Sequence, residues 1–131
     1  MRFLCTVALM LAFTATNAQN WQMSFCTELD TTIKACPDDA AEFQWNDEKL
    51  PLYVTVTNGE KLNIDKIFYK IFIMKNSNDG EIYAELRSAT RPEWKSVNKR
   101  IYFVKPGYYK VEIYDAANKR LAESFITIMG R

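Results

Sequence analysis

The amino-acid sequence predicts an all-β protein, an antiparallel sandwich in which two sheets pack face to face. Apolar and polar residues alternate with a period of two in several short segments, and turn residues separate these segments at regular intervals. Aromatic residues make up 14% of the chain, and aromatic and β-branched residues favour strands. No segment carries a long apolar repeat of 3.6 residues, so no long amphipathic helix is expected.

Turn signals delimit the expected strands. Asn58 and Gly59 both tolerate positive φ and predict a tight turn, residues 76–80 predict a second turn, and residues 105–107 predict a third. The short segment 42–45 is expected to be an edge strand. The strands expected along the chain cover residues 22–28, 42–45, 50–57, 64–75, 81–88, 100–104, 108–114 and 121–129.

The longest expected strand, residues 64–75, is apolar on both faces. One face would point into the core; it carries Ile67, Tyr69, Ile71 and Ile73. Phe68, Phe72 and Met74 lie on the other face, which is normally wet in a sandwich, and form a candidate apolar patch. An exposed patch predicts a partner protein or a homo-oligomer, whereas coverage by loops or by residues 42–45 would hide it.

The first eighteen residues have the pattern of a secretory signal peptide. Arg2 gives a positive start, residues 3–13 are an apolar run, and the segment ends in small residues at Ala18. The run of about eleven residues is well short of the roughly 20 that span a bilayer. We therefore expect residues 1–18 to be removed, and residues 19–131 to fold as a single secreted or periplasmic domain with no transmembrane segment.

Two of the three cysteines, Cys26 and Cys36, remain after signal cleavage. A pair of cysteines in an exported domain predicts a disulfide. By the loop-entropy relation, the ring it closes would stabilise the fold by about 2.5–3 kcal/mol. A reactive thiol pair is the alternative, but the spacing is not Cys-x-x-Cys and no histidine is available to activate a thiolate.

Composition argues against several classes of function. Without Arg2, basic and acidic residues balance at sixteen each, whereas nucleic-acid binding draws on a positive excess. The chain contains no histidine, which removes His-based catalytic triads and most zinc sites. We therefore expect no catalytic residues, no cofactor, no metal site and no nucleic-acid partner, and a protein that is not an enzyme.

Carboxylates offer the remaining chemical alternatives. Adjacent acidic pairs such as Asp38-Asp39 could serve a small hydrolase, but neighbouring residues point to opposite faces of a strand or lie solvated in a loop. Residues 76–81 resemble a fragment of a calcium loop. Because the full set of oxygen ligands and the flanking helices are missing, a hairpin turn explains this segment better.

Basic and aromatic side chains cluster between residues 87 and 102. The candidate binding patch consists of Arg87, Arg91, Trp94, Lys95, Lys99, Arg100 and Tyr102. Cations interleaved with aromatic rings can hold an acidic polysaccharide, a lipid headgroup or a protein through ion pairing and stacking. The alternative is a solvated connection between strands, in which Trp94 closes the bottom of the sandwich.

Residues 103–115 resemble the penultimate hairpin of bacterial immunoglobulin-like and fibronectin-III-like domains. An aromatic residue, a Pro-Gly turn, a tyrosine and alternating β-branched residues follow one another, and residues 121–128 are similar to the closing strand. The resemblance implies an immunoglobulin-like antiparallel β-sandwich of seven to eight strands. A tyrosine at the start of the strand can bury its ring while its hydroxyl reaches a backbone carbonyl, and Tyr109 has the phase for this role.

These observations predict a non-catalytic binding or structural module that works by contact, in protein–protein interaction or envelope assembly. The alternative is a carbohydrate or small-ligand binding domain that uses exposed aromatic side chains and the basic patch. Its candidate stacking platforms are Trp21, Trp45 and Trp94.

Overall fold

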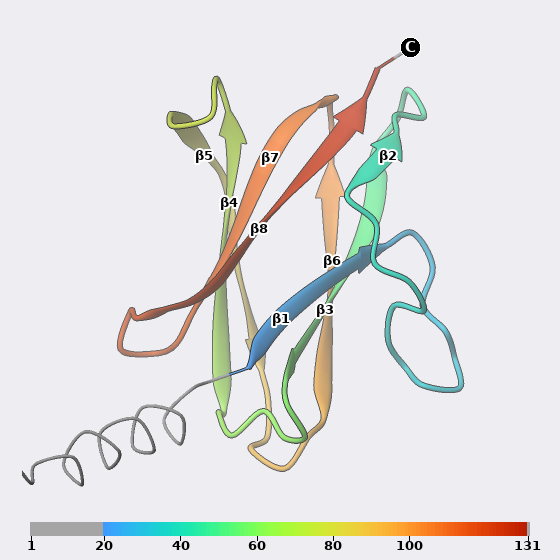
Figure 1. The fold of residues 1–131 in the computed structure, drawn as a ribbon. Coiled ribbons are helices and arrows are strands. Elements are labelled where there is room, and N and C mark those ends of the chain that lie inside the picture. Colours follow the sequence, from blue (N-terminus) through green and yellow to red (C-terminus); the bar gives the residue numbers. More distant parts are fainter. Residues whose placement is uncertain (1–19, 131) are drawn as a thin grey trace, which may run out of the picture.

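A computed structural model describes residues 20–130, which form two packed sheets (Figure 1). The all-β sandwich predicted from the sequence is confirmed, and the described residues contain no helix, so none that could cross a membrane. The predicted signal peptide, residues 1–18, lies outside the described residues. The strands are β1 (Trp21–Cys26), β2 (Glu42–Gln44), β3 (Leu50–Asn58), β4 (Lys66–Met74), β5 (Gly80–Ala89), β6 (Ser96–Phe103), β7 (Gly107–Tyr114) and β8 (Arg120–Met129).

The strand order is β1-β3-β6 in the three-stranded sheet and β2-β8-β7-β4-β5 in the five-stranded sheet. Neighbouring strands are antiparallel except β2 and β8, which pair in parallel through residues 42–44. Strands β1 and β2 belong to different sheets and run in a similar direction, and a loop that turns down and back joins them (Figure 1). The predicted edge strand is therefore confirmed, but the expectation of a wholly antiparallel sandwich is wrong at this edge.

The core lies between the sheets and consists of the residues that alternate inward. In β4, Ile67, Tyr69 and Ile71 are fully buried, whereas Phe68 and Phe72 lie half-buried on the outer face. The two faces of this strand are therefore those predicted from its period-two pattern. The same alternation buries one face of β3 and one face of β7, through Leu52, Val54, Val56, Tyr109, Val111 and Ile113.

Tyr109 fixes the turn between β6 and β7. Its ring is fully buried and packs edge-on against Phe103, with ring centroids 4.7 Å apart. Its hydroxyl donates a 2.7 Å hydrogen bond to the carbonyl oxygen of Lys105. This is the arrangement that the resemblance implied, and it couples the core to the turn through a single side chain.

Side chains close the open side of the sandwich, where β5 and β6 are the edge strands of the two sheets. The Tyr83 hydroxyl of β5 accepts a 2.8 Å hydrogen bond from the Val104 amide and donates a 3.2 Å bond to the Tyr102 carbonyl oxygen. In the other direction, the Lys99 ammonium of β6 donates a 2.9 Å hydrogen bond to the Arg87 carbonyl oxygen of β5. These bonds form a polar seam between the two edges.

Strand β6 begins at Ser96, four residues before the predicted start. Val97 is buried and in phase with Ile101 and Phe103, so the first part of the strand also faces the core. Lys99 falls on the same face as these buried residues, so a charged residue interrupts the apolar alternation by which the sequence would have shown the start of the strand. Because β6 is an edge strand, the long lysine stem can leave the core and place its ammonium in the seam.

Candidate functional site

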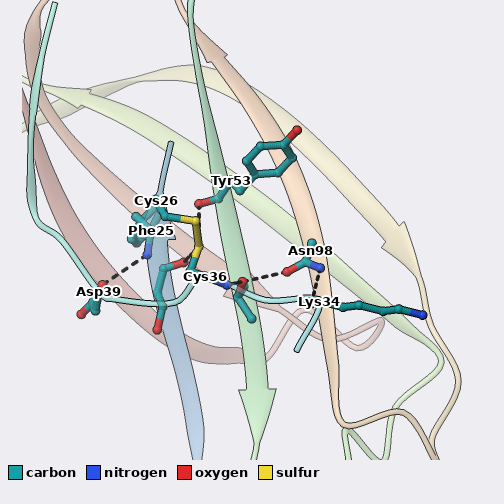
Figure 2. The surroundings of a disulfide bond; sticks show 9 residues. Phe25, Cys26, Lys34, Cys36, Asp39, Tyr53 and Asn98 are labelled. Atoms are coloured by element: carbon teal, nitrogen blue, oxygen red, sulfur yellow. Dashed lines mark hydrogen bonds between the residues drawn. A yellow bond between two sulfur atoms is a disulfide. The ribbon is translucent and has the colours of Figure 1, made fainter. Parts of the chain in front are cut away.

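Residues 27–41 connect β1 to β2 and lie against the outer face of the three-stranded sheet. The predicted disulfide between Cys26 and Cys36 is present, with Cα atoms 5.6 Å apart (Figure 2). The Cys36 amide donates a 2.9 Å hydrogen bond to the Thr55 hydroxyl, which in turn donates one of 2.7 Å to the Asn98 side-chain oxygen. The Asn98 amide group completes the chain with a 2.7 Å bond to the Lys34 carbonyl oxygen.

The disulfide ties this loop to the end of β1 and holds it against the neighbouring strand β3. The Cys36 sulfur lies 3.6 Å from the carbonyl oxygens of Ser24 and Tyr53; a disulfide sulfur carries no hydrogen, so these are packing contacts. Thr55 points out of the sheet and is nevertheless buried, because the loop covers it. The loop is therefore a fixed layer on the sheet.

The tip of the loop presents one apolar and one cationic side chain. The Asp30 carboxylate accepts hydrogen bonds from the amides of Thr32 and Ile33, at 2.8 and 3.2 Å, and so closes the turn from inside. Lys34 adopts a positive φ of 55°. Ile33 is 59% exposed, and the Lys34 side chain is exposed beside it.

The loop tip, the β5–β6 connection and the start of β6 line an open surface hollow of about 570 Å³, called here the Trp94 hollow. Its lining residues are Ile33, Lys34, Trp94, Lys95, Ser96, Val97 and Asn98. The ion pairs within residues 20–130 draw their cations from Lys75, Lys110 and Arg120, so the two lysines of the hollow have no carboxylate partner there. The hollow thus combines two unneutralised cations with exposed apolar surface.

The backbone holds Trp94 in place while its side chain stays outside. Its carbonyl oxygen accepts a 2.7 Å hydrogen bond from the Leu62 amide, and its own amide donates a 3.0 Å bond to the Arg91 carbonyl oxygen. Leu62 is fully buried, whereas Trp94 is 41% exposed. Leu62 therefore belongs to the core cluster, and the neighbouring Trp94 leaves a large part of its side chain accessible at the surface.

A row of alternating cations and rings continues from the hollow along the outer face of β6. Asn98 lines the hollow, and Arg100 and Tyr102 follow at two-residue intervals on the same face of the strand. The Arg100 guanidinium lies 5.3 Å from the Tyr102 ring centroid and 6.0 Å from that of Tyr53. The Lys49 ammonium lies 4.5 Å from the Tyr102 ring. We call Lys49, Tyr53, Arg100 and Tyr102 the Tyr102 ladder.

The remaining members of the predicted basic patch lie elsewhere. Lys99 belongs to the seam, and Arg87 lies on the outer face of the five-stranded sheet, opposite Phe68. Arg91 is exposed in the β5–β6 connection. Of the seven predicted residues, the structure brings Trp94 and Lys95 together in the hollow and places Arg100 and Tyr102 beside it. Sequence reasoning missed Ile33 and Lys34. The only feature of the sequence that points to them is the cysteine pair, because the disulfide folds their loop back onto the sheet.

The predicted apolar patch lies on the outer face of the five-stranded sheet, where Phe68, Phe72 and Met74 are half-buried. Strand β2 joins the far edge of this sheet beside β8, so residues 42–45 do not cover the patch. Side chains of β7 partly shield it instead: the Lys110 ammonium lies 4.8 Å from the Phe72 ring centroid. The sheet face thus mixes apolar groups with cations that lie over rings.

Glu112 on β7 holds a charged cluster that sequence reasoning missed. It is only 4% exposed although it lies on the outer face. One carboxylate oxygen accepts a 2.6 Å hydrogen bond from the Tyr114 hydroxyl, and the other lies 3.3 Å from both the Lys110 ammonium and the Arg120 guanidinium. Burial acts to raise the pKa of this carboxyl, but its hydrogen bonds and cations outweigh burial and lower that pKa.

The other candidate sites have structural explanations. The segment that resembles a calcium loop is the β4–β5 turn, in which the Asn76 side-chain oxygen accepts a bond from the Asn78 amide and Glu81 pairs with Lys75 at 2.8 Å. Asp39 accepts a bond from the Phe25 amide. Among the predicted stacking platforms, Trp94 is exposed, and the other two, Trp21 and Trp45, pack partly buried against the core.

No family model matches the chain, and no curated protein matches it either. Solved structures do resemble it. Superoxide reductase (neelaredoxin) from Ignicoccus hospitalis is 13% identical with a TM-score of 0.52, and the match covers 90% of this chain and 87% of that one. A variant of the same protein is also 13% identical, with a TM-score of 0.50 and coverages of 91% and 87%.

An immunoglobulin-like protein from Pseudomonas aeruginosa is 9% identical, and the match covers 88% of this chain and 99% of that one. Its TM-score is 0.46, too low to carry an argument. The strand order and the packing of the two sheets establish the sandwich without it.

The comparison corrects the prediction that the chain is not an enzyme. That prediction is drawn from composition, above all the lack of histidine, whereas superoxide reductases, which are enzymes, have a similar sandwich. At 13% identity the likeness establishes the fold alone, and a fold does not carry a function with it. Neither an enzymatic role nor its absence follows from the architecture.

The residues present do not fit the redox-active centre that reduction of superoxide requires. The chain has no histidine, and Cys26 and Cys36 are bonded to each other. Within residues 20–130 there is no group of three His, Cys, Asp or Glu side chains that could hold a metal ion. The activity of the similar structures is therefore not carried over to this chain.

Proposed function

We propose that this chain is an exported binding module that contacts an acidic segment of a partner protein through the Trp94 hollow and the Tyr102 ladder. One observation carries the proposal: a row of cations without carboxylate partners in the described residues lies beside exposed apolar side chains. Lys34, Lys95 and Arg100 supply the charge. An acidic partner would neutralise these cations and be steered to them by their field.

The apolar part of the hollow favours a polypeptide as the partner. Ile33 and Trp94 are 59% and 41% exposed, and large exposed side chains next to cations are typical of protein contact surfaces. An acidic peptide that also carries apolar side chains would use both kinds of group. A sugar ring would stack on Trp94 but would gain little from the aliphatic Ile33.

The compartment is part of the same proposal. A disulfide persists in an oxidising environment, and the bond between Cys26 and Cys36 supports a secreted or periplasmic protein. The same bond holds the loop that carries Ile33 and Lys34. Oxidation would thus complete the binding surface after export.

Fluorescence anisotropy with a labelled acidic peptide containing phenylalanine tests the proposal. The variant Lys34→Glu/Lys95→Glu should weaken binding roughly tenfold or more, which corresponds to about 1.4 kcal/mol. Affinity should also fall as salt is raised, because exposed charges are screened. The matched control Lys105→Glu/Lys119→Glu makes the same change in net charge at exposed sites away from the hollow.

The proposal requires the hollow variant to bind less tightly than the control while both keep the circular dichroism spectrum of the parent protein. Equal affinities of the two variants would show that only net charge matters, and would contradict the site. Tighter binding of a uronic-acid oligosaccharide than of the peptide, lost in the same hollow variant, would replace the protein partner with an acidic glycan.

A further inference from the structure

A second hollow, of about 490 Å³, lies on the outer face of the five-stranded sheet. Its lining includes Phe68 and Lys70 of β4, Glu85 and Arg87 of β5, and Asp115, Ala116 and Asn118 of the β7–β8 turn. We call it the Phe68 hollow. It unites one residue of the predicted apolar patch, Phe68, with one residue of the predicted basic patch, Arg87.

The register of β4 and β5 places opposite charges in this hollow without pairing them. Phe68 stands opposite Arg87, and Lys70 stands opposite Glu85. An ion pair between Lys70 and Glu85 would be the usual outcome for such neighbours. Instead, the Lys70 ammonium lies 4.4 Å from the centroid of the Tyr114 ring on the adjacent strand β7.

Glu85 and Arg87 therefore both remain unneutralised. In the part of the chain that the structure describes, neither side chain belongs to an ion pair. The two residues are two apart on one strand, so their side chains leave the same face roughly 7 Å from each other. With Lys70 lying over the Tyr114 ring, the exposed side chains of Glu85 and Arg87 leave one anion and one cation without an ion-pair partner beside the half-buried Phe68 ring.

The remaining wall is a rigid turn. The Asp115 carboxylate accepts hydrogen bonds from the amides of Ala117 and Lys119, at 2.9 and 2.8 Å. Asn118 adopts a positive φ of 66° and donates its amide to the Asp115 carbonyl oxygen. Because Asp115 is engaged in its own turn, it closes the hollow without neutralising Arg87.

From this arrangement we propose that the Phe68 hollow binds a short zwitterionic peptide. Arg87 receives its carboxylate, Glu85 its ammonium group, and Phe68 an apolar side chain. A ligand with only one charge would leave the other protein group partly desolvated and unpaired, which costs free energy. A ligand with both charges satisfies the two groups together.

The spacing selects the length of the ligand. Two extended residues span roughly 7 Å, which matches the separation of Glu85 and Arg87 along the strand. A dipeptide therefore fits the pair of charges better than a free amino acid, whose charged groups are closer together. The volume of about 490 Å³ lies within the range of small-molecule sites. This site lies on a different sheet from the proposed protein-binding surface and requires the opposite ligand chemistry, a ligand with no net charge.

Two-dimensional NMR of the ¹⁵N-labelled protein, titrated with the dipeptide Ala-Phe, tests the proposal. Amide shifts should move around residues 68–70, 85–87 and 115–118 while the rest of the spectrum stays in place. The N-acetylated dipeptide and the C-amidated dipeptide should each bind at least about tenfold more weakly, because each lacks one of the two charges. Failure of Ala-Phe to shift these amides would overturn the proposal, and so would equal affinity of the blocked peptides.

Variants locate the two charges. Glu85→Gln and Arg87→Gln should each weaken Ala-Phe binding at least about tenfold, and Arg87→Gln keeps the backbone carbonyl that Lys99 uses. Glu93→Gln and Arg91→Gln remove one charge of each sign at exposed positions outside the hollow and serve as controls. Unchanged affinity in both hollow variants would overturn the assignment. Because none of these residues lines the Trp94 hollow, acidic-peptide binding should stay unchanged, so the two proposals can fail separately.

Discussion

The Tyr109 hydroxyl donates its 2.7 Å hydrogen bond to the carbonyl oxygen of Lys105, four residues upstream in the same chain. The ring between these two points is fully buried among the aromatic side chains of Tyr83 and Phe103. A tyrosine in this position satisfies a turn carbonyl from inside the core. The bond therefore links the geometry of the turn to the packing of both sheets.

Tyr109→Phe should lower the free energy of unfolding by about 1–2 kcal/mol, because it leaves the Lys105 carbonyl without its donor and adds no new contact. Urea unfolding followed by circular dichroism measures the change. Tyr108→Phe is the matched control, since the Tyr108 ring is 41% exposed and no hydrogen bond of its hydroxyl occurs within residues 20–130. Equal losses in the two variants would contradict the role given to Tyr109.

The same residue should make the protein sensitive to alkali. Burial raises the pKa of the Tyr109 phenol to about 12, from about 10 in the unfolded chain. The folded state thus favours the neutral phenol, and this contribution to stability is complete below pH 10 and is lost as pH rises toward 12. Unfolding free energies measured between pH 9 and 12 should fall more steeply in the parent protein than in Tyr109→Phe. Parallel curves would contradict the assignment.

Glu112→Gln should lower the free energy of unfolding by about 1–2 kcal/mol, because the Lys110 and Arg120 cations lose a buried negative charge. The pKa of the Glu112 carboxyl is lowered in the folded state, so its contribution is present above the unfolded value near 4.3 and is lost as pH falls through the folded pKa. Unfolding curves at pH 7 and pH 3 should therefore differ less for the variant than for the parent.

Glu123→Gln is the control for this cluster. Glu123 is exposed and contacts Arg120 alone at 3.1 Å, and exposed ion pairs contribute little to stability. We expect a loss below about 0.5 kcal/mol for this variant. A loss as large as that of Glu112→Gln would show that the cluster acts through its exposed pair.

Cys26→Ser/Cys36→Ser should destabilise the fold by about 2.5–3 kcal/mol, because the unfolded chain regains the entropy that the closed ring removes. It should also weaken acidic-peptide binding, since the loop that carries Ile33 and Lys34 is then held on Thr55 and Asn98 by hydrogen bonds alone. Chemical denaturation and peptide anisotropy measure the two effects. A variant that loses stability but binds as tightly as the parent would separate the disulfide from the proposed surface.

The strands and the position of Tyr109 were predictable from the sequence because both depend on local patterns. Period-two alternation identified the core face of β4, and the Pro-Gly turn fixed the phase of the strand after it. The start of β6 was missed because Lys99 breaks the alternation, although its stem can reach past the edge of the sheet. The parallel pairing of β2 depends on a change of sheet, which has no local signal.

The candidate site was only partly predictable because it is assembled from separate segments. A run of basic residues in sequence is divided between two sheets, so Arg87 and Arg100 lie on different faces of the molecule. Conversely, Lys34 joins Lys95 through a loop that the disulfide folds back. Glu85 forms no ion pair with Lys70 because the Lys70 ammonium lies over the Tyr114 ring instead. No sequence pattern indicates which of these two contacts a lysine makes.

The seam made by Tyr83 and Lys99 bears on the tendency of the protein to aggregate through its strand edges. Exposed strand edges offer free amides and carbonyls to which another chain can add, and this is a route to amyloid-like assembly. Here the Tyr83 hydroxyl and the Lys99 ammonium already engage three of those edge groups. The two side chains thus occupy part of this open edge and make it a poorer template for the addition of another strand.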